Sequence, residues 1–137
     1  YVMDRPARIH SVRGHMHLRG KYQVIEAVYP DGRWEIINKL NWAHGWHTAF
    51  LYEDHVMPLL PKGTVLIVTN HFDNTADNPN NPDPNQWVVR GDRTVDEMSH
   101  SRIGMTYFDN EEDFERLVRE RELLLSRMEG RDLQASR

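Results

Sequence analysis

The chain has 137 residues, carries a formal charge of −4 from 17 basic and 21 acidic residues, and contains no cysteine. Its length is typical of one domain with a proper core. Without a basic surplus we expect no nucleic-acid partner, and without cysteine there are no disulfides or zinc–thiolate sites. No apolar run approaches the roughly 20 residues of a transmembrane span. The sequence begins at Tyr1 without a signal-like segment, so we interpret it as a processed protein or part of a longer one.

Short strands and turns are expected along most of the chain. Residues 8–18 alternate loosely between polar and apolar, which predicts a strand with an irregularity at Gly14. Residues 22–29 and 34–40 are rich in β-branched and aromatic residues, and the turn signal Pro30-Asp31-Gly32-Arg33 lies between them. This arrangement predicts a β-hairpin.

The strongest strand signal is 64–72, whose centre is apolar on both faces, as in the core of a sandwich. Further strands are predicted at 46–52, 86–90 and 103–108. Several short strands separated by turns indicate an all-β fold, an antiparallel β-sandwich or jelly roll over residues 1–108.

The segment 73–85 contains three prolines and many Asn and Asp residues, which excludes a helix or a central strand. Its carboxylate and amide oxygens are possible Ca²⁺ ligands, although their spacing fits no EF-hand. Hydrogen bonds from Asn and Asp side chains to the loop's own backbone explain the composition equally well.

Residues 109–137 form a different kind of segment, a predicted helical tail. Asn110 is the expected N-cap, acidic residues follow it, and an amphipathic helix is predicted over 111–129 with Gly130 just beyond its end. The apolar stripe consists of Phe114, Leu117, Val118, Leu124, Leu125 and Met128. This stripe either packs on the sandwich or docks to a partner chain.

His15 and His17 are the main candidate functional residues. On a strand, side chains at i and i+2 share a face, with α-carbons about 6–7 Å apart, so one metal ion could be held by both imidazoles. Two ordinary half-buried histidines are the alternative interpretation.

Met98 is the third candidate ligand. A copper ion that alternates between Cu(I) and Cu(II) is served by imidazoles plus a thioether, because sulfur favours Cu(I) while nitrogen binds both states. His15, His17 and Met98 form such a set and predict a site for one copper ion, although their spacing does not establish that they meet.

Four other histidines have competing interpretations. His44 and His47 lie in an aromatic turn and could hold a second metal, or simply pack or face solvent. His71, at the end of the strongest strand, is expected to be a core histidine or a neighbour of the metal ligands. His100 lies two residues beyond Met98 and would share its face of a strand, which makes it the best candidate for an extra ligand.

Around the candidate ligands, six segments follow one another in a recognisable order: Gly14–Lys21, Tyr29–Gly32, Leu60–Thr64, His71–Thr75, Asn78–Pro84 and Gly91–Met98. Together they resemble the C-terminal domain of bacterial copper type II, ascorbate-dependent monooxygenases, relatives of peptidylglycine α-hydroxylating monooxygenase and dopamine β-monooxygenase. The resemblance covers roughly residues 10–108.

The resemblance implies a specific function. In this family the C-terminal domain binds copper through a His-x-His pair, matched by His15 and His17, and a methionine, matched by Met98. That copper binds dioxygen, and a substrate C–H bond is hydroxylated. A companion redox domain or chain with a three-histidine copper supplies an electron, and the resemblance implies a periplasmic or secreted bacterial protein.

Some features differ from the family pattern. The electron-transfer domain is not part of this sequence, and the helical tail and segment 41–47 are not expected of the family. The alternative is therefore a non-catalytic structural or interaction module of a larger assembly that reuses the sandwich and docks through helix 111–129.

Overall fold

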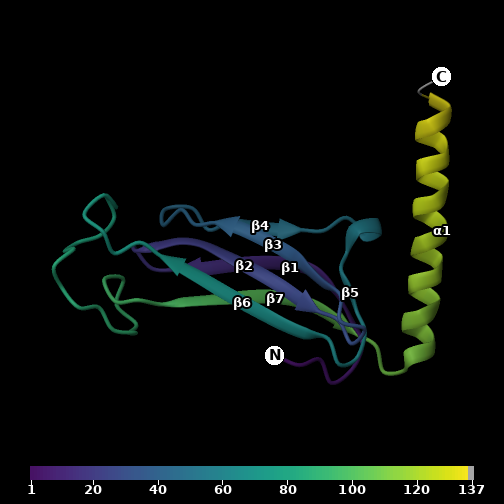
Figure 1. Cartoon of the computed structure of the whole chain (residues 1–137), viewed down its shortest axis with the longest axis horizontal. Helices are drawn as coiled ribbons and strands as arrows, with labels where there is room; N and C mark the ends of the chain where they lie inside the picture. Colours follow the sequence, from purple (N-terminus) through teal and green to yellow (C-terminus); the bar gives the residue numbers. More distant parts are fainter. Residues whose placement is uncertain (136–137) are drawn as a thin grey trace.

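The computed structural model describes residues 1–135, with side chains described as far as Met128. Two antiparallel β-sheets pack face to face, and one α-helix stands across one end of them (Figure 1). The predicted all-β sandwich with one C-terminal helix is therefore confirmed.

The first sheet is built around β1 (Ala7–Met16). Along one side, β7 (Ser99–Tyr107) pairs with its whole length. Along the other side, the short strands β4 (Ala49–Leu51) and β5 (Leu59–Leu60) pair with successive parts of β1, and the 3₁₀-helix η1 (Asp54–Val56) lies between them in the chain. The start of β1 thus lies beside the end of β7, and the end of β1 lies beside the start of β7.

The second sheet has β2 (Gly20–Val28) at its centre, between β3 (Trp34–Asn41) and β6 (Val65–Phe72). The predicted hairpin is confirmed: β2 and β3 pair from Val28↔Trp34 to Tyr22↔Asn41. Gly32 adopts φ +86° in the turn, a conformation that glycine tolerates best.

A β-bulge in β1 decides which of its residues face the core. The register with β7 shifts between Ile9 and Ser11. Ile9 is buried before the bulge, and Val12 and Met16 are buried after it. The inward positions therefore change from odd to even numbers, which places His15 and His17 on the outer side of the sheet.

The predicted irregularity at Gly14 was wrong in its position. Gly14 pairs regularly with Ser101. Its smallness serves the contact between the sheets, because a Cβ there would lie 2.3 Å from Gln23 Oε1 and 2.7 Å from Leu40 Cδ1. The core that both sheets enclose consists of Met3, Ala7, Ile9, Val12, Ile25, Ala27, Tyr29, Leu40, Leu60 and Leu66.

Three strand predictions need correction. The predicted strand 46–52 is reduced to Ala49–Leu51. Residues 86–90 do not form a strand: Trp87 is 97% exposed, and only Arg90 makes an isolated bridge, to Glu97. β7, in contrast, begins at Ser99 rather than at residue 103, so it includes His100. Pairing partners, and not local propensity, set these lengths.

The helix α1 (Glu111–Ala135) begins where it was predicted to begin. Asn110 Oδ1 accepts a hydrogen bond of 2.9 Å from the Asp113 backbone N–H, which confirms the N-cap. Its predicted end was wrong, since the chain stays helical through Gly130 to Ala135; a glycine inside a helix costs only about 1 kcal/mol. Within residues 1–135, no helix is long and apolar enough to cross a membrane.

Only the first part of α1 is held against the sandwich. Phe114 is buried, with its ring 5.6 Å from that of Phe108. Arg121 Nη1 donates a hydrogen bond of 2.6 Å to the Met57 carbonyl beside η1. Leu123 and Leu124 are exposed, and the second half of the helix runs past the strands (Figure 1).

Candidate metal centre

His15 and His17 lie at the end of β1 that is far from α1 (Figure 1). Their ring centroids are 5.3 Å apart and their planes are nearly perpendicular. His15 is half-buried, whereas His17 is only 7% exposed. The structure therefore brings the two predicted imidazoles together, on the outer face that the bulge assigns to them.

Met98 lies opposite His17. The β1–β7 ladder is paired as far as Met16↔Ser99, and the His17 backbone N–H donates a hydrogen bond of 3.1 Å to the Met98 carbonyl, which extends it by one position. Residues directly opposite one another in an antiparallel pair present their side chains to the same face. Continuation of this register assigns Met98 to the same face as His15 and His17, at one end of the two neighbouring strands.

The second ring nitrogen of His17 has a defined partner. His17 Nδ1 lies 3.1 Å from the Asp96 carbonyl oxygen, in a buried contact. A carbonyl can only accept a hydrogen bond, so Nδ1 carries a proton, and in the neutral ring the lone pair is then on Nε2. This is the arrangement by which proteins commonly orient a histidine that ligates a metal.

The loop that supplies this carbonyl is itself anchored. Asp96 is bound by Arg93 at 2.6 Å, and this hydrogen-bonded guanidinium lowers the pKa of the Asp96 carboxyl. The buried Arg19 donates to the Val95 carbonyl and, at 2.8 Å, to Asn81 Oδ1. The role of Arg19 was not predicted from the sequence, because its partners Asn81 and Val95 lie 62 and 76 residues away in the chain.

Two further histidines join the cluster around His15. His100 is paired with His15 across the ladder, and their rings stack at 4.7 Å. His47 comes from the loop between β3 and β4, and its ring lies 5.4 Å from that of His15. Both histidines are exposed. The Trp42 ring also belongs to this cluster, with its centroid 5.7 Å from that of His15.

The environment of His15 favours its neutral form. Burial lowers its pKa, and the nearby imidazoles of His100, His17 and His47 lower it further because each would carry a like charge. A neutral imidazole is the form that binds a metal.

The other two candidate histidines, His44 and His71, lie outside this cluster. His44 lies 6.4 Å from Trp42, and its Nδ1 and the Trp42 Nε1 are buried polar atoms without a hydrogen-bond partner among the described residues. His71 is exposed and stacks at 4.1 Å on Tyr22 in the second sheet. The expectation that His71 is a core histidine or a neighbour of the ligands was therefore wrong.

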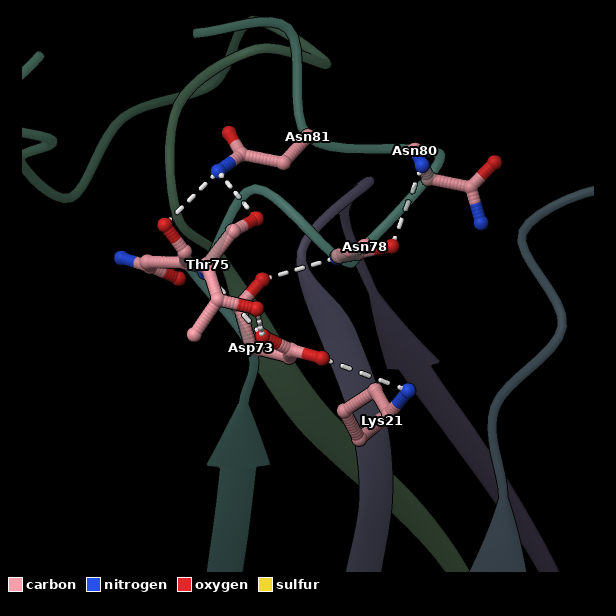
Figure 2. Close-up of polar contacts among 7 residues, drawn as sticks. Lys21, Asp73, Thr75, Asn78, Asn80 and Asn81 are labelled. Carbon is pink, nitrogen blue, oxygen red and sulfur yellow. Dashed lines mark hydrogen bonds and ion pairs between the residues drawn. The ribbon is translucent and has the colours of Figure 1, made fainter. Parts of the chain in front are cut away.

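Segment 73–85 is held by its own polar side chains (Figure 2). The Asp73 carboxylate accepts hydrogen bonds from the Thr75 backbone N–H and hydroxyl and pairs with Lys21 at 3.4 Å; the Thr75 bonds are the main cause of its lowered pKa. The Asn78 and Asn81 amides donate to backbone carbonyls. These bonds account for the composition of the loop, and calcium binding there stays a prediction.

Within residues 1–128, no three His, Asp or Glu side chains already converge on one point as a metal cage. The predicted set differs from such a cage, because it has two imidazoles and one thioether. The chain was also compared with protein-family models, curated proteins and solved structures, and nothing matched. The function must therefore be argued from the site.

Proposed function

We propose that the chain is a copper-binding domain that acts as the dioxygen-activating half of an ascorbate-dependent monooxygenase hydroxylating C–H bonds. The observation that carries the proposal is the position of Met98 opposite His17, with His15 5.3 Å from His17 on the same face. This backbone register supports a single site for the two imidazoles and the thioether of the predicted set.

The residues present fit copper. The contact of His17 Nδ1 with the Asp96 carbonyl leaves the lone pair of the neutral ring on Nε2, and the lowered pKa of His15 favours its neutral form. A thioether from Met98 would favour Cu(I). When bound, copper would supply the activation of dioxygen, since a three-ligand set leaves a coordination position open.

The chain's own residues have distinct roles in this proposal. His15 and His17 bind the ion, and the Asp96 carbonyl holds a proton on His17 Nδ1 and so orients the ring. The loop 91–98 covers His17, while His47 and His100 leave the other side of the site open to solvent. On the strength of the family resemblance, a companion redox domain or chain approaches from this open side, in the periplasm or outside the cell.

The test is the ligand shell of the bound ion. The purified chain should bind one Cu(I), and X-ray absorption should show nitrogen neighbours and one sulfur. Met98→Ala should remove the sulfur signal and retain the nitrogen signal. Met128→Ala, at an exposed position of α1, is the matched control and should leave the shell unchanged.

An unchanged metal shell in Met98→Ala would contradict the proposed ligand set. Circular dichroism of each variant shows whether the sandwich is intact, so that a lost signal is assigned to the ligand and not to unfolding.

The second candidate function is a non-catalytic interaction module that docks through α1 to a partner chain in a larger assembly. The exposed Leu123 and Leu124, 59% and 46% exposed on the part of α1 beyond the sandwich, favour it. Truncation after Glu122, which removes Leu123 and Leu124, should then abolish co-purification with the partner chain while leaving the melting temperature nearly unchanged. Retained co-purification after truncation would exclude docking through the end of the helix.

A further inference from the structure

His47 and His100 are imidazoles that the proposed copper site does not use. They come from different parts of the chain, the loop after β3 and the start of β7, and both lie beside His15. Neither belongs to the hydrophobic core, and both are exposed. Their position next to a candidate ligand therefore calls for a role other than packing.

The separations between the rings are close to those of imidazoles that share an ion, with the two longest slightly above that range. With a metal–nitrogen bond of about 2.0 Å, the centroid of a ligating imidazole lies about 3.2 Å from the ion. Two such rings at an angle of about 90–110° have centroids about 4.5–5.2 Å apart by the same geometry. The observed distances from His15 are 4.7 Å to His100, 5.3 Å to His17 and 5.4 Å to His47.

The rings must turn before they can ligate together, because their nitrogens do not yet converge among the described residues. His47 and His100 can do so without breaking core packing, since both side chains are exposed. His17 is already oriented by the Asp96 carbonyl. The cluster thus combines one fixed imidazole with two adjustable ones around His15.

Cupric and cuprous ions prefer different ligands. Cu(II) favours a tetragonal set of nitrogen and oxygen ligands, whereas soft thioether sulfur favours Cu(I). We propose that His100 and His47 join His15 and His17 as ligands of Cu(II), and that Met98 serves only Cu(I). This inference rests on the proposed function in taking copper as the ion, and it adds two ligands that the predicted set lacks.

The test uses the full chain loaded with Cu(II) and compares His100→Ala, His47→Ala and the double variant with the wild type. Pulsed electron paramagnetic resonance counts the coordinated imidazoles, and competition with a chelator measures Cu(II) affinity. Each single variant should lose one imidazole and bind Cu(II) on the order of tenfold more weakly. His71→Ala, another exposed histidine stacked on an aromatic ring of the other sheet, is the matched control and should change neither quantity.

Measurements on the Cu(I) form distinguish a failure of this inference from a failure of the proposed function. Met98→Ala should leave the Cu(II) spectrum unchanged, and the two histidine variants should keep the sulfur neighbour of Cu(I). If His100→Ala and His47→Ala leave the Cu(II) spectrum and affinity as in the wild type, the inference is overturned while the sulfur ligand still stands. If the cupric imidazoles are lost as expected but Cu(I) shows no sulfur, the proposed function and the role of Met98 fail, while the assignment of His47 and His100 as Cu(II) ligands survives.

Discussion

Single residues in this protein act through contacts that cross between segments. Gly14 allows the two sheets to approach at Gln23, and the Asp96 carbonyl selects the tautomer of His17. Both effects depend on where the backbone lies: that of Gly14 against the second sheet, and the Asp96 carbonyl against His17. Gly14 and Asp96 therefore matter although neither is a candidate metal ligand. Substitutions of such residues should therefore change how closely two segments approach one another, and not the local preference for strand or helix.

Gly14→Ala should destabilise the fold by about 1–3 kcal/mol, because the added methyl group would overlap Gln23 Oε1 and Leu40 Cδ1 in a well-packed interior. The measurement is the free energy of unfolding in urea. Gly45→Ala is the matched control: nothing lies within 4 Å of its added Cβ, and the change should stay within about 0.5 kcal/mol. Equal effects of the two substitutions would show that the close contact at Gly14 has no energetic consequence.

Protonation of the Asp96 carboxyl should make the free energy of unfolding depend on pH in the acid range. The hydrogen bond from Arg93 lowers its pKa in the folded state below the unfolded value of about 3.9. The stabilisation is therefore fully present above the unfolded pKa and is lost as the pH falls through the folded pKa. Asp96→Asn should be less stable than the wild type at neutral pH, and the difference should shrink on acidification below about pH 4.

Unfolding free energies of both proteins between pH 7 and pH 2 measure this difference. Asp92→Asn, in the same loop, is the control and should track the wild type. A constant difference between wild type and Asp96→Asn across the range would rule out the proposed linkage to the carboxyl.

At the scale of elements, α1 divides into a part that belongs to the sandwich and a part that does not. Phe114 packs on Phe108, and Arg121 is bonded to the carbonyl of Met57. A groove of about 440 Å³ between α1 and the sheets is lined partly by Tyr29 and Val118. Because an isolated helix is marginal in water, these contacts are what hold the first half of α1 in place.

Phe114→Ala should lower the free energy of unfolding by about 3 kcal/mol, since it removes a buried aromatic ring and leaves a cavity. Leu124→Ala, at an exposed position of the same stripe, is the matched control and should cost no more than about 0.5 kcal/mol. Chemical denaturation of the two variants measures both values. Similar losses for both would mean that the second half of α1 is also buried in solution.

In the whole molecule, the candidate metal centre and α1 occupy opposite ends of the sandwich (Figure 1). The β1–β7 ladder runs from Ala7↔Tyr107, near the start of α1, to Met16↔Ser99 at the histidine cluster. This separation leaves the open side of the cluster free for a redox partner and the end of the helix free for a second contact.

The isolated chain, loaded with copper and supplied with ascorbate and oxygen, should hydroxylate C–H substrates poorly or not at all. The proposed reaction draws its second electron from a copper in the companion domain or chain, and within residues 1–128 no cage of three His, Asp or Glu side chains is present to hold that copper. Oxygen consumption and product analysis measure the turnover, with free copper ions as the control. Robust hydroxylation by this chain alone would contradict the proposed need for a second copper in a companion domain or chain.

Local sequence signals determined the class of fold and most of its elements. The β-hairpin over residues 22–40, its turn at residues 30–33 and the Asn110 cap depend on residues close in sequence, and each appears where it was predicted. The i, i+2 spacing likewise predicted that His15 and His17 share a face, which the 5.3 Å separation of their rings bears out.

Only the tertiary structure decided what surrounds these two histidines. The bulge after Ile9 sets which face they occupy, and cross-strand register brings Met98 opposite His17 and His100 opposite His15. A loop from the edge of the other sheet adds His47. Register and loop closure depend on pairing between residues far apart in the chain, which local periodicity cannot specify because a shift of one residue reverses every side chain.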